Sequence, residues 1–218
     1  MAEATVDPAA AAAEKAALED AARKIDHARM RQIGGYHFAM AMGVLTLWGA
    51  GQVWAATTGS FLAEAVAVGN AVVAGFVLMS IFHEWGHFTG ARLSGAVSPM
   101  LEEPRRHFFL FDFDMEKNDL RQFSWMSWGG ILAPWLAVLL VLAFADLRLL
   151  SSVVLLATLV FRAVAAGAFE APIVLAAGQS GNPGAELGKA VAGGGLDRGR
   201  RVGMAVGIAC FALVWLAV

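Results

Sequence analysis

The feature that most restricts the fold is an apolar run at residues 65–82, which contains no charged side chain. A charge-free run of this length is typical of a helix that crosses a bilayer. The whole chain has the same character: of its 218 residues, 58% are hydrophobic and 16% are charged, and the mean hydropathy is +0.62. Such a composition excludes an ordinary soluble domain and predicts an all-α polytopic membrane protein.

Five apolar segments are long enough to span a membrane. Polar or glycine-rich stretches separate them, with a polar connection at residues 94–121 and an expected loop at residues 178–199. The expected spans are residues 37–57, 61–93, 123–144, 149–177 and 202–218.

The amino-terminal segment, residues 1–35, is rich in alanine and carries charges of both signs. We expect it to be a polar helical extension and not a secretory signal, followed by a membrane domain at residues 36–218. With five spans, the extension and the two long connections lie on one side of the membrane, and they hold most of the arginine and lysine residues. Because cytoplasmic segments carry an excess of these residues, we expect an integral protein of a bacterial inner (cytoplasmic) membrane with a cytoplasmic amino terminus.

An H-E-x-x-H pattern, formed by His83, Glu84 and His87, lies directly after the charge-free run. Histidines four residues apart lie one turn apart on the same face of a helix, so both rings can reach one metal ion. Glu84 stands beside the first histidine, where zinc hydrolases place a general base. Histidine and glutamate are costly in an apolar span, so the pattern predicts a Zn²⁺ site. The alternative is a pair of hydrogen-bonded histidines that only pack helices.

Zinc takes three or four protein ligands, so the two histidines need a third. Glu170 lies in the fourth span at a depth similar to that of the histidines, and an intramembrane carboxylate is a functional-site candidate by default. Pro172 follows it and would loosen the helix, which would help the carboxylate turn inward. Asp197, in the expected loop, is the alternative third ligand, and a site that uses neither residue is the remaining possibility.

The polar connection contains an alternating stretch at residues 109–115, in which Phe109, Phe111, Phe113 and Met115 fall on one face. Alternation of this kind predicts a short β-strand. A strand edge can pair with an unwound peptide, which makes Phe109, Phe111 and Phe113 candidate substrate-binding residues.

Together these features resemble the site-2 protease family of intramembrane zinc metalloproteases. The resemblance spans about residues 61–200 and is strong only at residues 83–92, His83-Glu84-Trp85-Gly86-His87 and the following Phe88-Thr89-Gly90-Ala91-Arg92. It implies that the two histidines are zinc ligands, that Glu84 is the general base, and that residues 36–218 form a metalloprotease-like domain. The segment from Gly129 to Pro134 is similar to the glycine- and proline-bearing stretch of the family's middle core helix. The strand at residues 109–115 is similar to the edge strand that the family offers to substrates.

One part of the chain departs from the family pattern. The family carries an aspartate in an L-D-G motif on its third core segment, whereas here the fourth span ends Leu175-Ala176-Ala177-Gly178, with alanine at that place. The run Leu196-Asp197-Arg198-Gly199 is closer in letters but follows the span that should carry it. The departure leaves both Glu170 and Asp197 as candidates for the third zinc ligand.

The expected function is hydrolysis of a peptide bond in a transmembrane protein or peptide substrate near the cytoplasmic face, with Zn²⁺ as the cofactor. The alternative is a non-catalytic membrane subunit or scaffold of a larger complex, whose histidines bind a structural metal or haem. In that case His37, at a depth similar to that of the H-E-x-x-H pattern, could supply one axial ligand. No basic block suggests nucleic acid, and the single cysteine, Cys210, excludes a disulfide framework or a thiolate zinc site.

Overall fold

The computed structural model describes residues 8–105 and 109–217. Within them the chain forms six helices and one antiparallel pair of strands. Five of the helices, all except α5, are long and apolar enough to cross a membrane, which confirms the expected all-α polytopic membrane protein. The elements are α1 (Pro8–Thr58), α2 (Phe61–Leu93), β1 (Met100–Arg105), β2 (Phe109–Phe111), α3 (Leu120–Phe144), α4 (Leu150–Ser180), α5 (Pro183–Ala192) and α6 (Gly195–Ala217).

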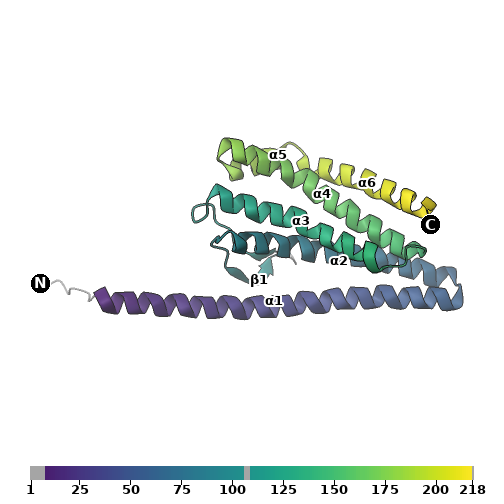
Figure 1. Cartoon of the computed structure of the whole chain (residues 1–218), viewed down its shortest axis with the longest axis horizontal. Helices are drawn as coiled ribbons and strands as arrows, with labels where there is room; N and C mark the ends of the chain where they lie inside the picture. Colours follow the sequence, from purple (N-terminus) through teal and green to yellow (C-terminus); the bar gives the residue numbers. More distant parts are fainter. Residues whose placement is uncertain (1–7, 106–108, 218) are drawn as a thin grey trace, which may run out of the picture.

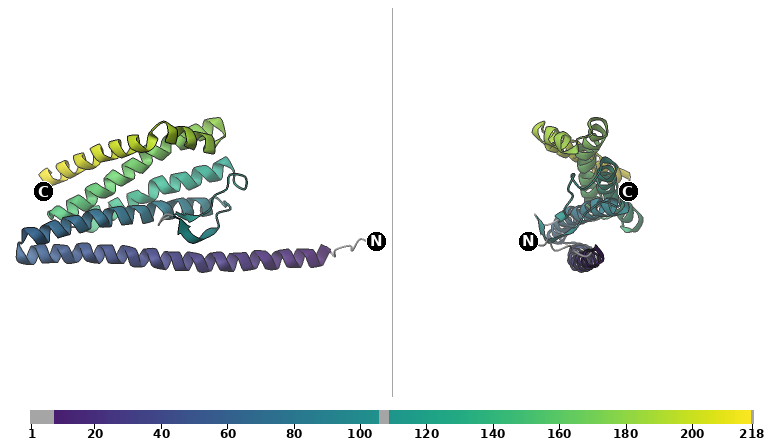
Figure 2. Two further views of the ribbon diagram at one scale, coloured as in Figure 1. Left: turned by 180° about the vertical axis from the view of Figure 1, so that it is seen from behind. Right: turned by 90° about the vertical axis from the view of Figure 1, so that its left-hand side faces the viewer.

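Helix α1 lies along one side of the bundle, and its amino-terminal part projects beyond the other helices (Figure 1). The extension is helical as expected from Pro8 onward, and residues 1–7 lie outside the described residues. The expected boundary between residues 35 and 36 falls inside this one uninterrupted helix. Helices α1 and α6 lie on opposite sides, with α2, α3 and α4 between them (Figure 2). The side chains inside the bundle are therefore expected to come mainly from α2, α3 and α4.

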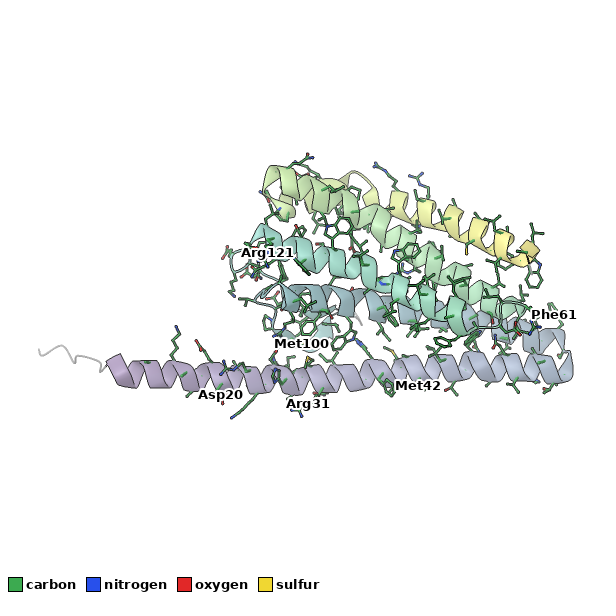
Figure 3. The ribbon with its side chains drawn as sticks, viewed as in Figure 1. Asp20, Arg31, Met42, Phe61, Met100 and Arg121 are labelled. Atoms are coloured by element: carbon green, nitrogen blue, oxygen red, sulfur yellow. The ribbon has the colours of Figure 1, made fainter. Side chains whose placement is uncertain are left out.

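The apolar core lies where α2, α3 and α4 meet. Leu155 and Leu159 of α4 are fully buried there, in a cluster that includes Met79 of α2 and Val138 of α3. The outer surface is also apolar, and Phe61, at the start of α2, is 85% exposed (Figure 3). Apolar side chains on both the inside and the outside are what a lipid-embedded bundle requires.

Helices α2 and α3 approach each other so closely that glycine is required where they touch. A Cβ atom at Gly86 would overlap the carbonyl oxygen of Gly129, and one at Gly90 would overlap that of Trp125. Small residues of this kind let membrane helices pack backbone to backbone, as the glycines near the start of the third span suggested. Helices α4 and α6 meet in the same manner at Gly199, Gly203 and Gly207, a close packing that was not predicted from the sequence.

The expected loop at residues 178–199 is wrong, because it contains helix α5 and the start of α6. Asn182 caps α5 by accepting a hydrogen bond from the amide of Ala185 at 3.0 Å, and Pro183 occupies the first helical position. Of the glycines that suggested a loop, four stand at helix ends (Gly181, Gly193, Gly194 and Gly195), and the other four lie within helices. Gly181 and Gly194 have φ angles of 71° and 72°, which glycine adopts without strain.

The expected strand is shorter than residues 109–115. Strand β2 ends at Phe111 and pairs with β1, which the sequence analysis did not foresee, with Met100 opposite Phe111. Phe113 and Met115 therefore lie beyond the strand, in a turn where Asp114 accepts a hydrogen bond from the amide of Glu116 at 2.8 Å. One further bond, from the Asp112 amide to the Pro99 carbonyl at 3.0 Å, continues the pairing before the chain turns.

The strand pair is fastened to α1 and to the end of α2. Asp26 of α1 accepts a hydrogen bond from the Met100 amide at 2.7 Å, and its second oxygen pairs with Arg92 at 2.6 Å. Met100 faces α1 (Figure 3), where Ile33, Phe88 and Leu110 form a small apolar cluster with it. The amino-terminal helix thus holds the strands beside the carboxyl end of the helix that carries the H-E-x-x-H pattern.

Candidate metal centre

Three side chains predicted as metal ligands converge between α2, α3 and α4. His83 Nε2 lies 3.1 Å from Glu170 Oε1, and His87 Nε2 lies 3.5 Å from Glu170 Oε2. The two histidine Nε2 atoms are 3.2 Å apart. All three residues are partly buried, and their ligand atoms lie within 4.8 Å of one another, so they could hold one metal ion.

The other ring nitrogen of each histidine faces a backbone carbonyl of α3. His83 Nδ1 lies 3.1 Å from the Gly130 oxygen, and His87 Nδ1 lies 3.0 Å from the Met126 oxygen. A carbonyl can only accept, so each Nδ1 carries a proton, and in the neutral imidazole each Nε2 then presents a lone pair. Two lone pairs and a carboxylate then point at one place. A cation between them stabilises this arrangement, whereas without a cation the three acceptors would repel one another.

The sequence supplies the carbonyl that holds His83. Pro134 lies inside α3 and has no amide hydrogen, so the Gly130 carbonyl, four residues earlier, lacks its usual helical donor. His83 donates to that carbonyl instead. Gly130 has a second role, because a Cβ atom there would overlap the imidazole of His87. Gly130 and Pro134 therefore position both histidines.

Glu170 reaches the histidines from α4 as the depth argument predicted. Its side chain is 18% exposed, and α4 remains helical through Pro172. The helix therefore need not unwind for the carboxylate to face inward, contrary to the loosening expected from the proline.

Glu84 lines a cavity of about 470 Å³ next to the three converging side chains. His87 and Glu170 line the same cavity, and Asp112 contributes a third carboxylate to it. Among the described lining residues there is no lysine or arginine, so the electrostatic environment favours a cation. Glu84 is not one of the three grouped ligands, which leaves its carboxylate available for a different task.

The remainder of the cavity wall is apolar. Phe111 and Phe113, two of the predicted substrate-binding residues, line it, whereas the side chain of Phe109 lies outside the described part of the structure. The walls that α3, α4 and α5 provide were not predicted from the sequence. These are Phe123, Met126, Phe169, Ile173, Val174 and Leu187.

The structure does not bring Asp197 to the histidines. It lies in the first turn of α6 with 70% of its side chain exposed, and it pairs with Arg200 at 3.1 Å. Of the two candidate third ligands, the geometry groups Glu170 with His83 and His87.

His37 also lies apart from the grouped ligands. It is 1% exposed, and its Nδ1 accepts a hydrogen bond from the indole of Trp85 at 3.0 Å. Trp85 follows His83 by two residues, about 200° around the helix, so it faces the other side of α2. The arrangement therefore gives no support to a haem held between His37 and the H-E-x-x-H histidines.

Comparison with family models, with curated proteins and with solved structures finds no match for this chain. The fold and the site define the class: a polytopic helical membrane protein with a candidate metal centre of two histidines and one glutamate. Any narrower assignment depends on the chemistry of that centre.

Proposed function

We propose that this chain is an intramembrane zinc metalloprotease of the site-2 protease type. The observation that supports it best is the convergence of His83, His87 and Glu170 next to a cavity that Glu84 lines. Two histidines, one carboxylate and a separate glutamate match the ligand set and general base of zinc peptidases. The histidine orientation by α3 carbonyls adds the outer hydrogen bonds that such sites require.

In this proposal His83, His87 and Glu170 hold Zn²⁺. When bound, the ion supplies Lewis-acid polarisation of the scissile carbonyl and makes water more acidic. Glu84 accepts a proton from the attacking water as the water oxygen bonds to the carbonyl carbon. Glu84 then delivers that proton to the leaving amine as the C–N bond breaks, so the carboxylate is regenerated.

The substrate in this proposal is a membrane-embedded peptide that becomes extended at the site. A two-stranded sheet leaves one edge of each strand outside its ladder, and β2 ends beside the cavity that Phe111 and Phe113 line. Edge pairing would hold the peptide backbone, while the apolar walls would receive its side chains. The excess of arginine and lysine at this end of the bundle supports a cytoplasmic site and amino terminus in a bacterial inner membrane.

The decisive experiment measures metal content and peptide cleavage in the same purified protein. We expect about one zinc ion per chain in the wild type and in Glu84→Gln, and none in the double variant of His83→Ala and His87→Ala. Cleavage of quenched fluorogenic peptides with bulky apolar residues, added in detergent micelles, is expected from the wild type alone. Wild-type protein that contains no zinc would contradict the proposal. A shared proton, and not a metal ion, would then bridge the three side chains. Zinc without a difference between wild type and Glu84→Gln would indicate a structural metal in a scaffold.

A further inference from the structure

Helices α4 and α6 carry arginines at one level of the bundle. A Cβ atom at Gly199 would lie 2.7 Å from the Ala165 oxygen, and one at Gly203 would lie 2.8 Å from the Ala165 side chain. The stretch of α6 between these glycines is therefore level with Ala165 of α4, and Arg162 lies three residues, about 4.5 Å, before Ala165. Four arginines lie within about one helical turn of this level and form an arginine band: Arg162, Arg198, Arg200 and Arg201.

The arginine band lies at one end of the apolar zone of the bundle. On α2 this zone is the charge-free run at residues 65–82. A Cβ atom at Gly75 would lie 2.6 Å from the Thr158 side chain, so these two residues mark the same level on α2 and α4. Both helices run from there towards the metal centre, so Ala165, seven residues after Thr158, is level with Phe82 at the end of the run. The band therefore lies where the lipid headgroups begin.

Arg162 is the member of the band with a buried donor that has no acceptor. Its guanidinium carbon lies 5.2 Å from the ring centroid of Phe76 on α2. Its Nε atom is buried without a hydrogen-bond partner, and none of the ion pairs found among the described residues includes Arg162. A cation–π contact compensates only part of the lost hydration. The guanidinium therefore keeps donors for an oxyanion, and its planar fork matches the oxygens of a phosphate.

Arg200 flanks the contact between α6 and α4. At about 100° per residue it lies about 60° around the helix from Gly203, which faces α4, whereas Arg201 lies about 160° from Gly203, on the outer face. Arg200 pairs with Asp197 at 3.1 Å, but the two side chains are 69% and 70% exposed. An exposed ion pair is weak, so Arg200 can exchange this partner for another anion.

The surface on the membrane side of Arg162 and Arg200 is apolar and exposed. Phe76 is 41% exposed, and Met204, one turn beyond Arg200 along α6, is 48% exposed. Phe161 packs against Phe76 with 6.1 Å between ring centroids. A soluble anion would leave these side chains uncovered, whereas a lipid would place its phosphate at the arginines and its acyl chains on the apolar surface. Basic sites between helices at headgroup level are typical of anionic-lipid recognition.

We propose that Arg162 and Arg200 bind the phosphate of an anionic phospholipid, whose acyl chains cover Phe76 and Met204. The phosphate oxygens would accept hydrogen bonds from the Arg162 guanidinium. Phosphatidylcholine carries the same phosphate with a compensating ammonium group, so it gains less from the positive charge of the band. This inference rests on α2, α4 and α6 and does not require the chain to be a protease.

The test is native mass spectrometry of the full chain in a neutral detergent. The protein is titrated with phosphatidylglycerol or with phosphatidylcholine of the same acyl chains, and the lipid-bound fraction gives an apparent dissociation constant for each. We expect the wild type to bind phosphatidylglycerol about tenfold more tightly, the range that arginines near an anionic headgroup supply. Arg162→Gln should reduce this preference to about twofold. Arg201→Gln removes the same charge from the outer face of α6 and should keep most of it, and Arg148→Gln, at the opposite end of the bundle, should leave it unchanged.

The comparison of the two lipids on the wild type does not depend on how any variant folds. Equal affinities for the two lipids would overturn the proposal. A loss in Arg201→Gln as large as in Arg162→Gln would also overturn it, because attraction to the whole band, and not a site at Arg162, would then explain the preference. Displacement of phosphatidylglycerol by soluble glycerophosphoglycerol, which has no acyl chains, would assign the site to a free phosphate compound instead.

Discussion

The two ends of the bundle differ in how their buried polar atoms are matched with hydrogen-bond partners. At the end remote from the metal centre, Gln52 of α1 donates to the hydroxyls of Ser151 and Ser152 at 3.0 and 2.8 Å. Donors meet acceptors there, and the network is complete without a ligand. At the other end, the Nε2 atoms of two imidazoles and a carboxylate face one another, and neutral imidazoles would present only acceptors there. The contrast shows that polarity alone does not identify a site in a membrane protein, whereas an excess of converging acceptors does.

The largest effect is expected from Glu84→Gln at the metal-bearing end. The amide cannot accept and return a proton, so cleavage should fall by about 10²–10⁴-fold while zinc content stays the same. The measurement is the cleavage rate of the fluorogenic peptides together with metal analysis. Loss of zinc in this variant would instead make Glu84 a ligand, and the division of roles within the site would have to be redrawn.

A smaller effect is expected from Gly130→Ala, which tests the positioning of the ligands. The added methyl group would overlap the His87 ring, so zinc affinity should fall by about 10–100-fold, as for loss of an outer-shell contact. Competition with a chromophoric chelator measures this affinity. Gly43→Ala is the matched control, because nothing lies within 4 Å of a Cβ atom at Gly43. Equal affinities of the two variants would show that the close contact at Gly130 does not control the site.

Gln52→Leu probes the completed network at the opposite end. Loss of the amide leaves two serine hydroxyls without their donor, and the free energy of unfolding should fall by about 1 kcal/mol. Zinc affinity should not change, since the two ends share no side chain. Thermal unfolding in detergent and chelator competition together check both halves of this prediction. A change in zinc affinity would mean that the ends are coupled through the helices.

The smallest effect is expected at the α3–α4 link. Hydrogen bonds from the Arg148 guanidinium and amide lower the pKa of Asp146 to about 2, from a usual value of 3.8. A carboxylate with a lowered pKa stabilises the folded state above its usual pKa, and this contribution is lost as the pH falls towards about 2. Asp146→Asn should therefore reduce the acid sensitivity of thermal unfolding slightly between these values. An identical pH profile for both proteins would show that this exposed pair has no measurable role.

Much of the fold followed from apolar patterning, because a bilayer leaves few alternatives to a helix. The expected second span coincides with α2, whose limits are set by the turn at Gly59 and by Ser94. Helix α5 was missed because its flanking glycines dominate the local composition. Strand β1 was missed because its Glu-Glu-Pro composition does not favour a strand.

Only those parts of the site that follow from helical spacing and from depth in the membrane could be predicted from the sequence. Helical spacing and depth identified His83, His87 and Glu170, which the structure groups. They left Asp197 open, because its distance from the histidines depends on the path of α5 and α6. The partners of the two Nδ1 atoms are backbone carbonyls, which in general cannot be recognised from sequence. Gly130 is the exception, because Pro134 has no amide hydrogen to bond to the Gly130 carbonyl.

The unbroken course of α1 has a mechanical consequence. A helix of 51 residues is a stiff rod about 76 Å long, and Asp26 ties it to the strand pair beside the cavity. A tilt of the amino-terminal part of α1 that projects beyond the other helices would therefore move the strands as well, because the helix between them has no break that could absorb the tilt.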